Sequence, residues 1–265
     1  MAELASECER KLASGVRALD VVEHAVAELE TSGMYVAGRG SAPNSAGYVE
    51  LDASIMDGRS RDAGAVAAVV SVVNPVKAAR QVMENTPHVM LVSKGAREFA
   101  TEQGLELVDD PERYYVLPVG VYEHELREQE HGTVGAVALD TSGDLAAATS
   151  TGGTFGKLEG RVGDSPLIGP GTWADDQIAI SCTGTGEQII RAGGALAVAY
   201  KVRAGMSPQA AIDEMLAEVK SLGGDGGVIA VTQTGEIAMR YNSQGMKRAS
   251  VSTTKSVHAT TFADD

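Results

Sequence analysis

Two threonines lie at the same end of a predicted β-hairpin. The hairpin is predicted from two apolar runs, TVGAVALD and LAAATST, which the turn residues Thr141–Asp144 join. Depending on the strand register, Thr133 faces Thr151 or the next residue, Gly152, and in both registers the two hydroxyl side chains lie within reach of each other. A threonine hydroxyl is a nucleophile once a base takes its proton, yet threonine is also a common strand residue. Spacing alone therefore leaves a catalytic pair and an ordinary strand pair both open.

Other residues that often do chemistry lack the spacing of a known site. The string CTGTGE contains Gly-x-Gly but not the third glycine of a dinucleotide-binding fingerprint. The histidines show no zinc-ligand spacing; they are His24, His88, His124, His131 and His258. We therefore predict neither a metal centre nor an organic cofactor.

The composition restricts the class of protein. The 265 residues include 36 Asp and Glu against 22 Lys and Arg, so the net charge is −14, and the pI is about 4.8. This charge repels phosphates and argues against nucleic-acid or anionic-membrane partners. No apolar run approaches the roughly 20 residues that a membrane helix needs, and the start, MAELASECERK, has no secretory signal. Since Cys8 and Cys182 form no CxxC motif, we expect a cytoplasmic protein.

The spacing of apolar residues predicts the helices and strands that position these side chains. Apolar residues recur every three or four positions from Leu4 to Val22, which predicts a helix from the start of the chain to about Glu30. The first half continues with a strand over Tyr48–Met56, a helix over Pro75–Glu84, a strand in PHVMLV and a helix in AREFATEQGLEL. Residues 109–132 lose this periodicity and are rich in acidic side chains, which indicates a solvated connector.

The second half combines helices with antiparallel hairpins. After the first hairpin we predict a helix over Gly186–Arg203, a helix that Ser207 and Pro208 begin, and a hairpin formed by GVIAVT and EIAMRYN. Helices and hairpins are grouped and do not strictly alternate. This arrangement favours packed layers of sheet and helix over a doubly wound parallel sheet.

Four strings of the second half resemble the β-subunit of isoaspartyl peptidases and plant-type asparaginases in order and spacing: HGTVGAVALD, GDLAAATSTGG, GRVGDSPLIGPGT and SCTGTGE. The resemblance extends through LGGDGGVIAVTQTGEIAMRYNSQGMKRA and, in the first half, through GYVELDASIMDG, NPVKAARQVMENTPHVMLV and EFATEQGLELVD. It implies the fold of amino-terminal-nucleophile (Ntn) hydrolases, an α+β four-layer αββα sandwich. It also implies one domain made of two halves, residues 1–132 and 133–265, and an (αβ)2 assembly.

The resemblance assigns the chemistry to Thr133, freed as a new amino terminus by self-cleavage of the Gly132–Thr133 bond. The new α-amine, with an intrinsic pKa near 8, can take the proton of the hydroxyl on the same residue. Glycine at position 132 tolerates the backbone strain that attack on this bond requires. Thr151 is expected to form a hydrogen bond with the nucleophile from the facing strand.

The same resemblance implies an oxyanion hole and a substrate clamp. Thr183 and Gly184 correspond to the oxyanion hole, through a hydroxyl and a main-chain N–H, just before a helix that begins near Gly186. Arg161 and Asp164 correspond to the groups that bind the α-carboxylate and the α-ammonium of a β-aspartyl substrate, and Gly186 lines the same site. The alternative for Arg161 and Asp164 is an ordinary surface ion pair.

Three features depart from the family pattern. Family members begin with a strand that ends in His-Gly-Gly-Ala-Gly, and this motif does not occur in the sequence. An asparagine near the family's active site is replaced by Val36. The Leu29–Tyr35 loop resembles one that binds a structural sodium ion through main-chain oxygens, but its composition differs, so a structural sodium ion stays open as an alternative. We expect the strand next to the family's first strand to keep an unpaired edge beside an apolar slot. This chain should then be less stable, and should self-cleave more slowly, than a version with such a strand.

The expected function is hydrolysis of small zwitterionic β-aspartyl substrates: isoaspartyl dipeptides and the side-chain amide of L-asparagine. Two alternatives remain open. One is an unprocessed or non-catalytic homologue that keeps the fold, and the other is a glycosylasparaginase-like Ntn hydrolase.

Overall fold

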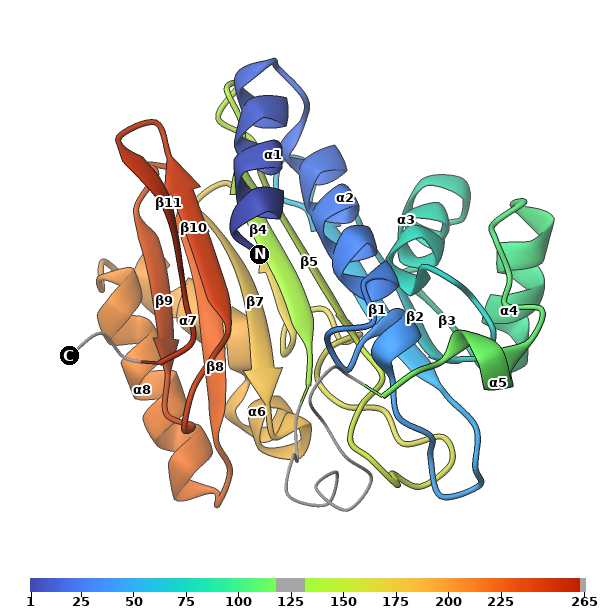
Figure 1. Cartoon of the computed structure of the whole chain (residues 1–265). Helices are drawn as coiled ribbons and strands as arrows, with labels where there is room; N and C mark the ends of the chain where they lie inside the picture. The colour runs from blue at the N-terminus through green and yellow to red at the C-terminus, as the bar shows by residue number, and fades with distance from the viewer. Residues whose placement is uncertain (118–131, 263–265) are drawn as a thin grey trace.

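The computed structural model describes residues 1–117 and 132–262. Two β-sheets pack face to face, and helices cover the outer face of each sheet (Figure 1). This is the predicted α+β fold with its αββα layers. Most of the predicted acidic connector, residues 109–132, lies outside the described residues.

Five strands form the larger sheet: β1 (Leu51–Asp57), β2 (Ala63–Val69), β3 (Met90–Val92), β4 (Val134–Leu139) and β5 (Leu145–Thr151). Their spatial order is β3-β2-β1-β5-β4. The central strand β1 pairs antiparallel with β5, so strands from both predicted halves share one sheet. Every residue of β1, β2 and β5 is buried, as expected for a sheet that is covered on both faces.

Four strands form the smaller sheet: β6 (Thr172–Ala174), β7 (Ile178–Gly184), β8 (Gly226–Thr232) and β9 (Ile237–Tyr241). They follow one another in space and are all antiparallel, and β8 and β9 form the predicted second hairpin. A separate hairpin of β10 (Arg248–Ser252) and β11 (Lys255–Thr260) packs against the first helix. The sequence did not predict this hairpin, because its partly exposed strands have no apolar periodicity.

The described helices are α1 (Ala2–Ala13), α2 (Ala18–Thr31), α3 (Pro75–Asn85), α4 (Ser93–Glu102), α5 (Pro111–Tyr114), α6 (Gly186–Ala192), α7 (Gly194–Arg203) and α8 (Pro208–Ser221). The larger sheet is covered by α2, α3 and α4, and the smaller sheet by α6, α7 and α8 (Figure 1). One apolar core lies on each side of the sandwich. Among the described helices, none combines the length and the hydropathy needed to cross a membrane.

Two predicted helices are each divided in two. The helix predicted to continue to Glu30 is interrupted between α1 and α2, where Gly15 has φ +89°, a left-handed conformation that ends helices. The helix predicted over Gly186–Arg203 is interrupted between α6 and α7, where Gly193 has φ +78°. Apolar spacing continues across both interruptions, so periodicity alone did not reveal them. The predicted start of α8 is confirmed, because the Ser207 hydroxyl caps this helix.

A chain of buried hydroxyl groups joins the two sheets. Ser54 donates a hydrogen bond to the hydroxyl of Thr172 at 2.7 Å, and Thr172 donates to the hydroxyl of Thr149 at 2.5 Å. The Thr149 hydroxyl also lies 2.7 Å from the Ser181 hydroxyl on β7. All four residues are at most 4% exposed, so their hydroxyls need partners within the protein. The Ser54 hydroxyl also lies 2.6 Å from the main-chain oxygen of Ser165, an alternative acceptor.

We predict that Thr149→Val destabilises the protein by about 1–3 kcal/mol, because it keeps the shape of the side chain but leaves neighbouring buried hydroxyls without their partner. Urea unfolding monitored by circular dichroism measures this change. The matched control is Thr101→Val on the exposed face of α4, which should change the unfolding free energy by less than about 0.5 kcal/mol. Equal effects in the two variants would show that the hydroxyl chain does not stabilise the sandwich.

The strand β4 is an edge of the larger sheet, because within the described residues it pairs with β5 alone. Beside it lies a groove of about 600 Å³ between the two sheets and α1. The groove is lined mainly by apolar side chains, which include Leu4, Val137, Ile229, Met239 and Val251. An unpaired edge next to an apolar slot therefore exists in the structure. The lower stability and slower self-cleavage expected from it stay predictions.

Candidate active site

Several strand ends meet at one end of the sandwich. The first residue of β4 and the last residues of β5 and β7 lie there, and α6 begins directly after β7 (Figure 1). The residue before β4 is Thr133, β5 ends at Thr151 and β7 ends at Gly184. The fold therefore brings together the segments that carry the predicted nucleophile, its partner and the oxyanion hole.

The β4–β5 hairpin adopts the register that places the two threonines opposite each other. Val134 pairs with Ser150, so the preceding residue, Thr133, faces Thr151. The Thr151 hydroxyl donates a hydrogen bond of 2.5 Å to the carbonyl oxygen of Gly132. This carbonyl belongs to the bond that is predicted to be cut. In the intact chain Thr151 thus polarises the scissile carbonyl, whereas the sequence predicted a contact with the nucleophile itself.

Gly132 lies where only glycine fits. A Cβ atom at this position would lie 2.3 Å from Cβ and 2.4 Å from Cγ2 of Val36. The main chain of Val36 is held in turn, because its carbonyl oxygen accepts the N–H of Gly152. Close approach of Val36, the residue that departs from the family pattern, gives a reason for glycine at this position. The tolerance of backbone strain during attack, which was expected from the sequence, stays a prediction.

The oxyanion-hole residues lie on β7, which packs closely against β4. A Cβ atom at Gly135 of β4 would lie 2.1 Å from the Ser181 hydroxyl, so the glycine permits the close approach of the two sheets. Thr133 and Thr183 line the same groove. Gly184 has φ +135°, and a Cβ atom there would lie 2.3 Å from the carbonyl oxygen of Asp225, so glycine is required on both counts. The oxyanion role of Thr183 and Gly184 stays a prediction.

Arg161 is held by a residue that sequence reasoning missed. Its Nε and Nη2 atoms donate to the two carboxylate oxygens of Glu187, each at 2.8 Å. The pair uses one edge of the guanidinium, so the edge formed by Nη1 and Nη2 is the one that a substrate carboxylate would use. Glu187 directly follows Gly186 in the string SCTGTGE, but no spacing rule connects it with Arg161. The ordinary surface pair considered for Arg161 and Asp164 is not what the structure shows, because Arg161 pairs with Glu187 and Asp164 is buried.

Asp164 has a buried carboxylate oxygen, Oδ2, that lacks a hydrogen-bond partner within the described parts of the chain. Burial raises the pKa of this carboxyl to about 7, although a main-chain N–H and the charge of Arg161 act in the opposite direction. A Cβ atom on Gly186 would lie 2.9 Å from Oδ1 of Asp164 and 3.0 Å from Nη2 of Arg161. Glycine at position 186 therefore permits the close approach of both charged groups to the start of α6. Their role in binding the α-carboxylate and the α-ammonium of a substrate stays a prediction.

The raised pKa of Asp164 predicts that amino-acid binding depends on pH. The carboxyl is charged above pH 7 and can then bind an ammonium group, so affinity should fall as the pH decreases below about 7. Isothermal titration calorimetry with L-aspartate between pH 5.5 and 8.5 should show the dissociation constant rising up to about tenfold per pH unit on the acid side. The Asp164→Asn variant should bind weakly at every pH. An unchanged acid slope in this variant would contradict the assignment.

The structure contains no cluster of three or more His, Cys, Asp or Glu side chains suited to a metal ion, as far as residues 1–117 and 132–262 are concerned. In the loop compared with a sodium site, the carbonyl oxygen of Leu29 accepts the Ser32 hydroxyl and that of Tyr35 accepts the N–H of Ala37. These two oxygens accept hydrogen bonds within the protein. The sodium ion considered for this loop stays a prediction.

Comparison with known proteins adds an independent observation. A family profile described as "Asparaginase" matches residues 1–261. The chain is 45% identical over 264 residues to "Isoaspartyl peptidase" of Escherichia coli, and the aligned region covers 91% of this chain and 81% of that protein. It is 43% identical to "Isoaspartyl peptidase" of Salmonella typhimurium over 94% of this chain and 85% of that protein. It is 42% identical to "Isoaspartyl peptidase/L-asparaginase" of Rattus norvegicus over 95% of this chain and 79% of that protein.

Proposed function

The chain belongs to the asparaginase family, and we propose that it hydrolyses β-aspartyl linkages, both in isoaspartyl dipeptides and in the side-chain amide of L-asparagine. The observation that carries this proposal is the hydrogen bond from the Thr151 hydroxyl to the carbonyl of Gly132, directly before Thr133. It places a polarising group on the one bond whose cleavage would free a threonine amino terminus. Arg161 and Asp164, which both lie close to Gly186, supply the complementary charges for the substrate.

Self-cleavage is the first chemical event in this proposal. The Thr133 hydroxyl attacks the carbonyl carbon of Gly132, while Thr151 stabilises the negative charge that develops on the carbonyl oxygen. The C–N bond breaks, the threonine nitrogen takes the proton of the hydroxyl, and an ester joins Gly132 to the threonine oxygen. Water then hydrolyses the ester. The products are a carboxylate on Gly132 and a free α-amine on Thr133.

The free α-amine then acts as the base for substrate hydrolysis. It takes the proton of the Thr133 hydroxyl as the oxygen attacks the β-carbonyl of the substrate. Thr183 and Gly184 stabilise the resulting oxyanion, and the leaving amine receives the proton as its C–N bond breaks. Water releases L-aspartate from the acyl-enzyme and restores the hydroxyl. Arg161 and Asp164 hold the α-carboxylate and α-ammonium in place during both steps.

A pair of isomeric dipeptides tests the proposed function. We expect the processed protein to hydrolyse β-aspartyl-leucine and to leave α-aspartyl-leucine intact, because only the β-linked isomer has a free α-carboxylate and α-ammonium on the same carbon. Chromatography of released leucine measures both reactions, and ammonia release measures L-asparagine hydrolysis. Equal cleavage of the two dipeptides, or none of either by fully processed protein, would contradict the proposal. Preference for N-acetylglucosaminyl-asparagine would indicate the glycosylasparaginase-like alternative.

An unprocessed homologue is the second candidate function, and one observation favours it. Val36 lies against Gly132 at a position where the family has an asparagine, so the scissile bond is in contact with an apolar side chain. If the chain remains whole after prolonged incubation, Val36→Asn becomes the decisive variant. Cleavage that appears only in this variant would support the proposal that the natural chain is an unprocessed homologue.

We also propose that two αβ units pair to form an (αβ)2 assembly in the cytoplasm, with small zwitterionic substrates and without nucleic-acid partners. The support is the family resemblance and, for the charge-based part, the net charge of −14. Light scattering coupled to size-exclusion chromatography distinguishes one αβ unit from two.

A further inference from the structure

Three buried charged residues lie in or beside the clamp loop, the segment that runs from Gly152 after β5 to Arg161. The proposed mechanism does not use them. Glu50 directly precedes β1, Asp52 belongs to β1, and Lys157 lies in the loop that leads from β5 to Arg161. They are 4%, 0% and 5% exposed. Burying a charge is costly unless it is paired and hydrogen-bonded, so the contacts of these residues show what they hold in place.

The carboxylate of Glu50 holds the peptide unit from which Arg161 extends. Both of its oxygens accept the N–H of Gly160 at 3.1 Å, and one also accepts the side-chain N–H of Asn44 at 2.9 Å. Gly160 immediately precedes Arg161 and has φ +78°. The backbone therefore turns at the residue that Glu50 binds, and the orientation of this turn sets the direction of the Arg161 side chain.

Lys157 and Asp52 hold Glu50 in its own position. The Lys157 ammonium donates to the main-chain oxygen of Glu50 at 3.1 Å and lies 3.9 Å from a carboxylate oxygen of Asp52. The other oxygen of Asp52 accepts the N–H of Ala68 at 2.8 Å. Asp52 also faces Thr151 across the β1–β5 ladder. The cluster thus connects the clamp loop to β5, the strand that ends at Thr151.

The β1–β2 pairing is irregular at this cluster. The register shifts between Leu51 and Ala53, so that Asp52 lies opposite two residues of β2, Ala67 and Ala68, and Ala68 has φ +48°. A positive φ at alanine is strained and persists only where the surroundings hold it. The hydrogen bond from the Ala68 N–H to Asp52 supplies such a restraint. The chain keeps a strained bulge at the point where the cluster is anchored.

We propose that Glu50 is a positioning residue, which orients Arg161 toward the α-carboxylate of the substrate through its hydrogen bonds to the N–H of Gly160. This inference rests on the proposed function, because it concerns how the substrate clamp is built. Glu50 does not touch the substrate. Self-cleavage should not depend on it, because the scissile bond in the precursor has no α-carboxylate to be clamped.

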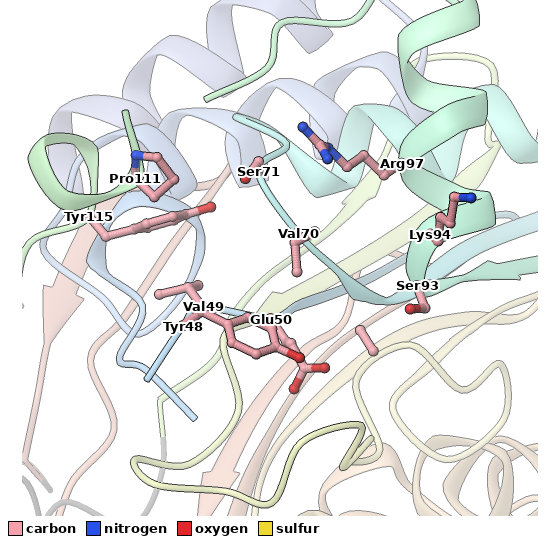
Figure 2. Close-up of a pocket in the computed structure, with 11 residues that line it drawn as sticks. Tyr48, Val49, Glu50, Val70, Ser71, Ser93, Lys94, Arg97, Pro111 and Tyr115 are labelled. Carbon is pink, nitrogen blue, oxygen red and sulfur yellow. The ribbon is translucent and has the colours of Figure 1, made fainter. Parts of the chain in front are cut away.

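The fold should tolerate a smaller side chain at position 50, because Glu50 lies at the wall of an existing pocket. It lines a pocket of about 400 Å³ together with Tyr48 and Tyr115, and Figure 2 shows its carboxylate beside the Tyr48 side chain at the wall of this pocket. Removal of the carboxylate enlarges an existing pocket and creates no new enclosed void. The fold should therefore tolerate the change better than a change at Asp52 or Lys157.

The test compares Glu50→Ala with Glu50→Gln on a β-aspartyl anilide that has a free α-carboxylate. We expect Glu50→Ala to raise KM about tenfold with kcat changed by less than about threefold, since a small misplacement of a binding group costs this much or more. Self-cleavage should proceed at the rate of the natural sequence. Glu50→Gln should recover most of the KM, because its side-chain carbonyl oxygen can still accept the N–H of Gly160. The matched control is Glu159→Ala, which removes an exposed acidic side chain directly before Gly160.

Each outcome either supports or overturns the inference. Equal loss of kcat and of self-cleavage in Glu50→Ala, or failure of Glu50→Gln to restore KM, would show a merely structural role. Unchanged kinetics in Glu50→Ala would overturn the inference while leaving the proposed function intact, whereas absence of turnover by the natural sequence would overturn the proposed function itself. If Glu50→Ala does not fold, Asn44→Asp takes its place. This variant replaces the N–H donor to Glu50 by a repelling carboxylate, and KM should rise several-fold.

Discussion

Replacement of Thr133 by alanine is expected to leave the chain whole and to abolish hydrolysis of β-aspartyl dipeptides. The hydroxyl is the attacking group in both reactions, and its facing partner Thr151 donates a hydrogen bond to the carbonyl oxygen of Gly132 in the intact chain. Loss of a nucleophile typically lowers turnover by about 10⁴-fold or more. Denaturing gels measure the cleavage, and leucine release from β-aspartyl-leucine measures the turnover. Cleavage of Thr133→Ala at the same bond would contradict the assignment.

The matched control for this prediction is Thr141→Ala. Thr141 lies at the opposite, exposed end of the same hairpin, so the variant removes a hydroxyl from the hairpin without touching the site. It should be processed and active like the natural sequence. Thr133→Ser, which keeps a hydroxyl at the nucleophile position, should still cleave itself. Failure of Thr141→Ala to process would mean that the hairpin tolerates no substitution and that the result for Thr133 has no bearing on chemistry.

Replacement of Arg161 by alanine is expected to raise KM for β-aspartyl dipeptides about 100-fold, equivalent to about 2.7 kcal/mol of binding, while self-cleavage continues. The variant removes the guanidinium that lies close to Gly186, and it leaves the charge of Glu187 there, which should repel the α-carboxylate. Steady-state kinetics and the rate of fragment appearance measure the two effects separately. Unchanged KM would show that Arg161 serves only to bind Glu187.

The control for Arg161 is Arg59→Ala. Arg59 is an exposed arginine whose nearest carboxylate, that of Asp144, lies 3.8 Å away at the far end of the β4–β5 hairpin. Its removal changes the net charge by the same amount as Arg161→Ala. Similar increases of KM in both variants would indicate a general electrostatic effect and no specific clamp.

Local signals in the sequence were sufficient for the elements that present the nucleophile. The turn Thr141–Asp144 and the apolar runs on either side predicted the hairpin, and of its two open registers the structure has the one that pairs Thr133 with Thr151. Proline at position 75 and the Ser207 cap predicted the starts of two helices correctly. Turn chemistry and helix caps involve neighbouring residues, so they can be read from the sequence.

Contacts between distant segments could not be read in this way. Glu187 lies 26 positions from Arg161, and Val36 lies 96 positions from Gly132, so neither contact leaves a trace in local spacing. The buried cluster around Glu50 was also missed, because a charged residue in a strand-like run is usually exposed. The breaks in two predicted helices depend on glycines whose conformation only tertiary packing determines. The resemblance to a family supplied the roles of the site residues, and the structure supplied their neighbours.

The intact mass of the purified protein tests the central claim most directly. We predict that the 265-residue chain separates into two fragments of 132 and 133 residues, and that amino-terminal sequencing of the second fragment begins Thr-Val-Gly-Ala at Thr133. This result would show that the bond polarised by Thr151 is the one that is cut and that the new amino terminus is a threonine. A single uncleaved mass after prolonged incubation, or a second fragment that begins at any other residue, would contradict the account.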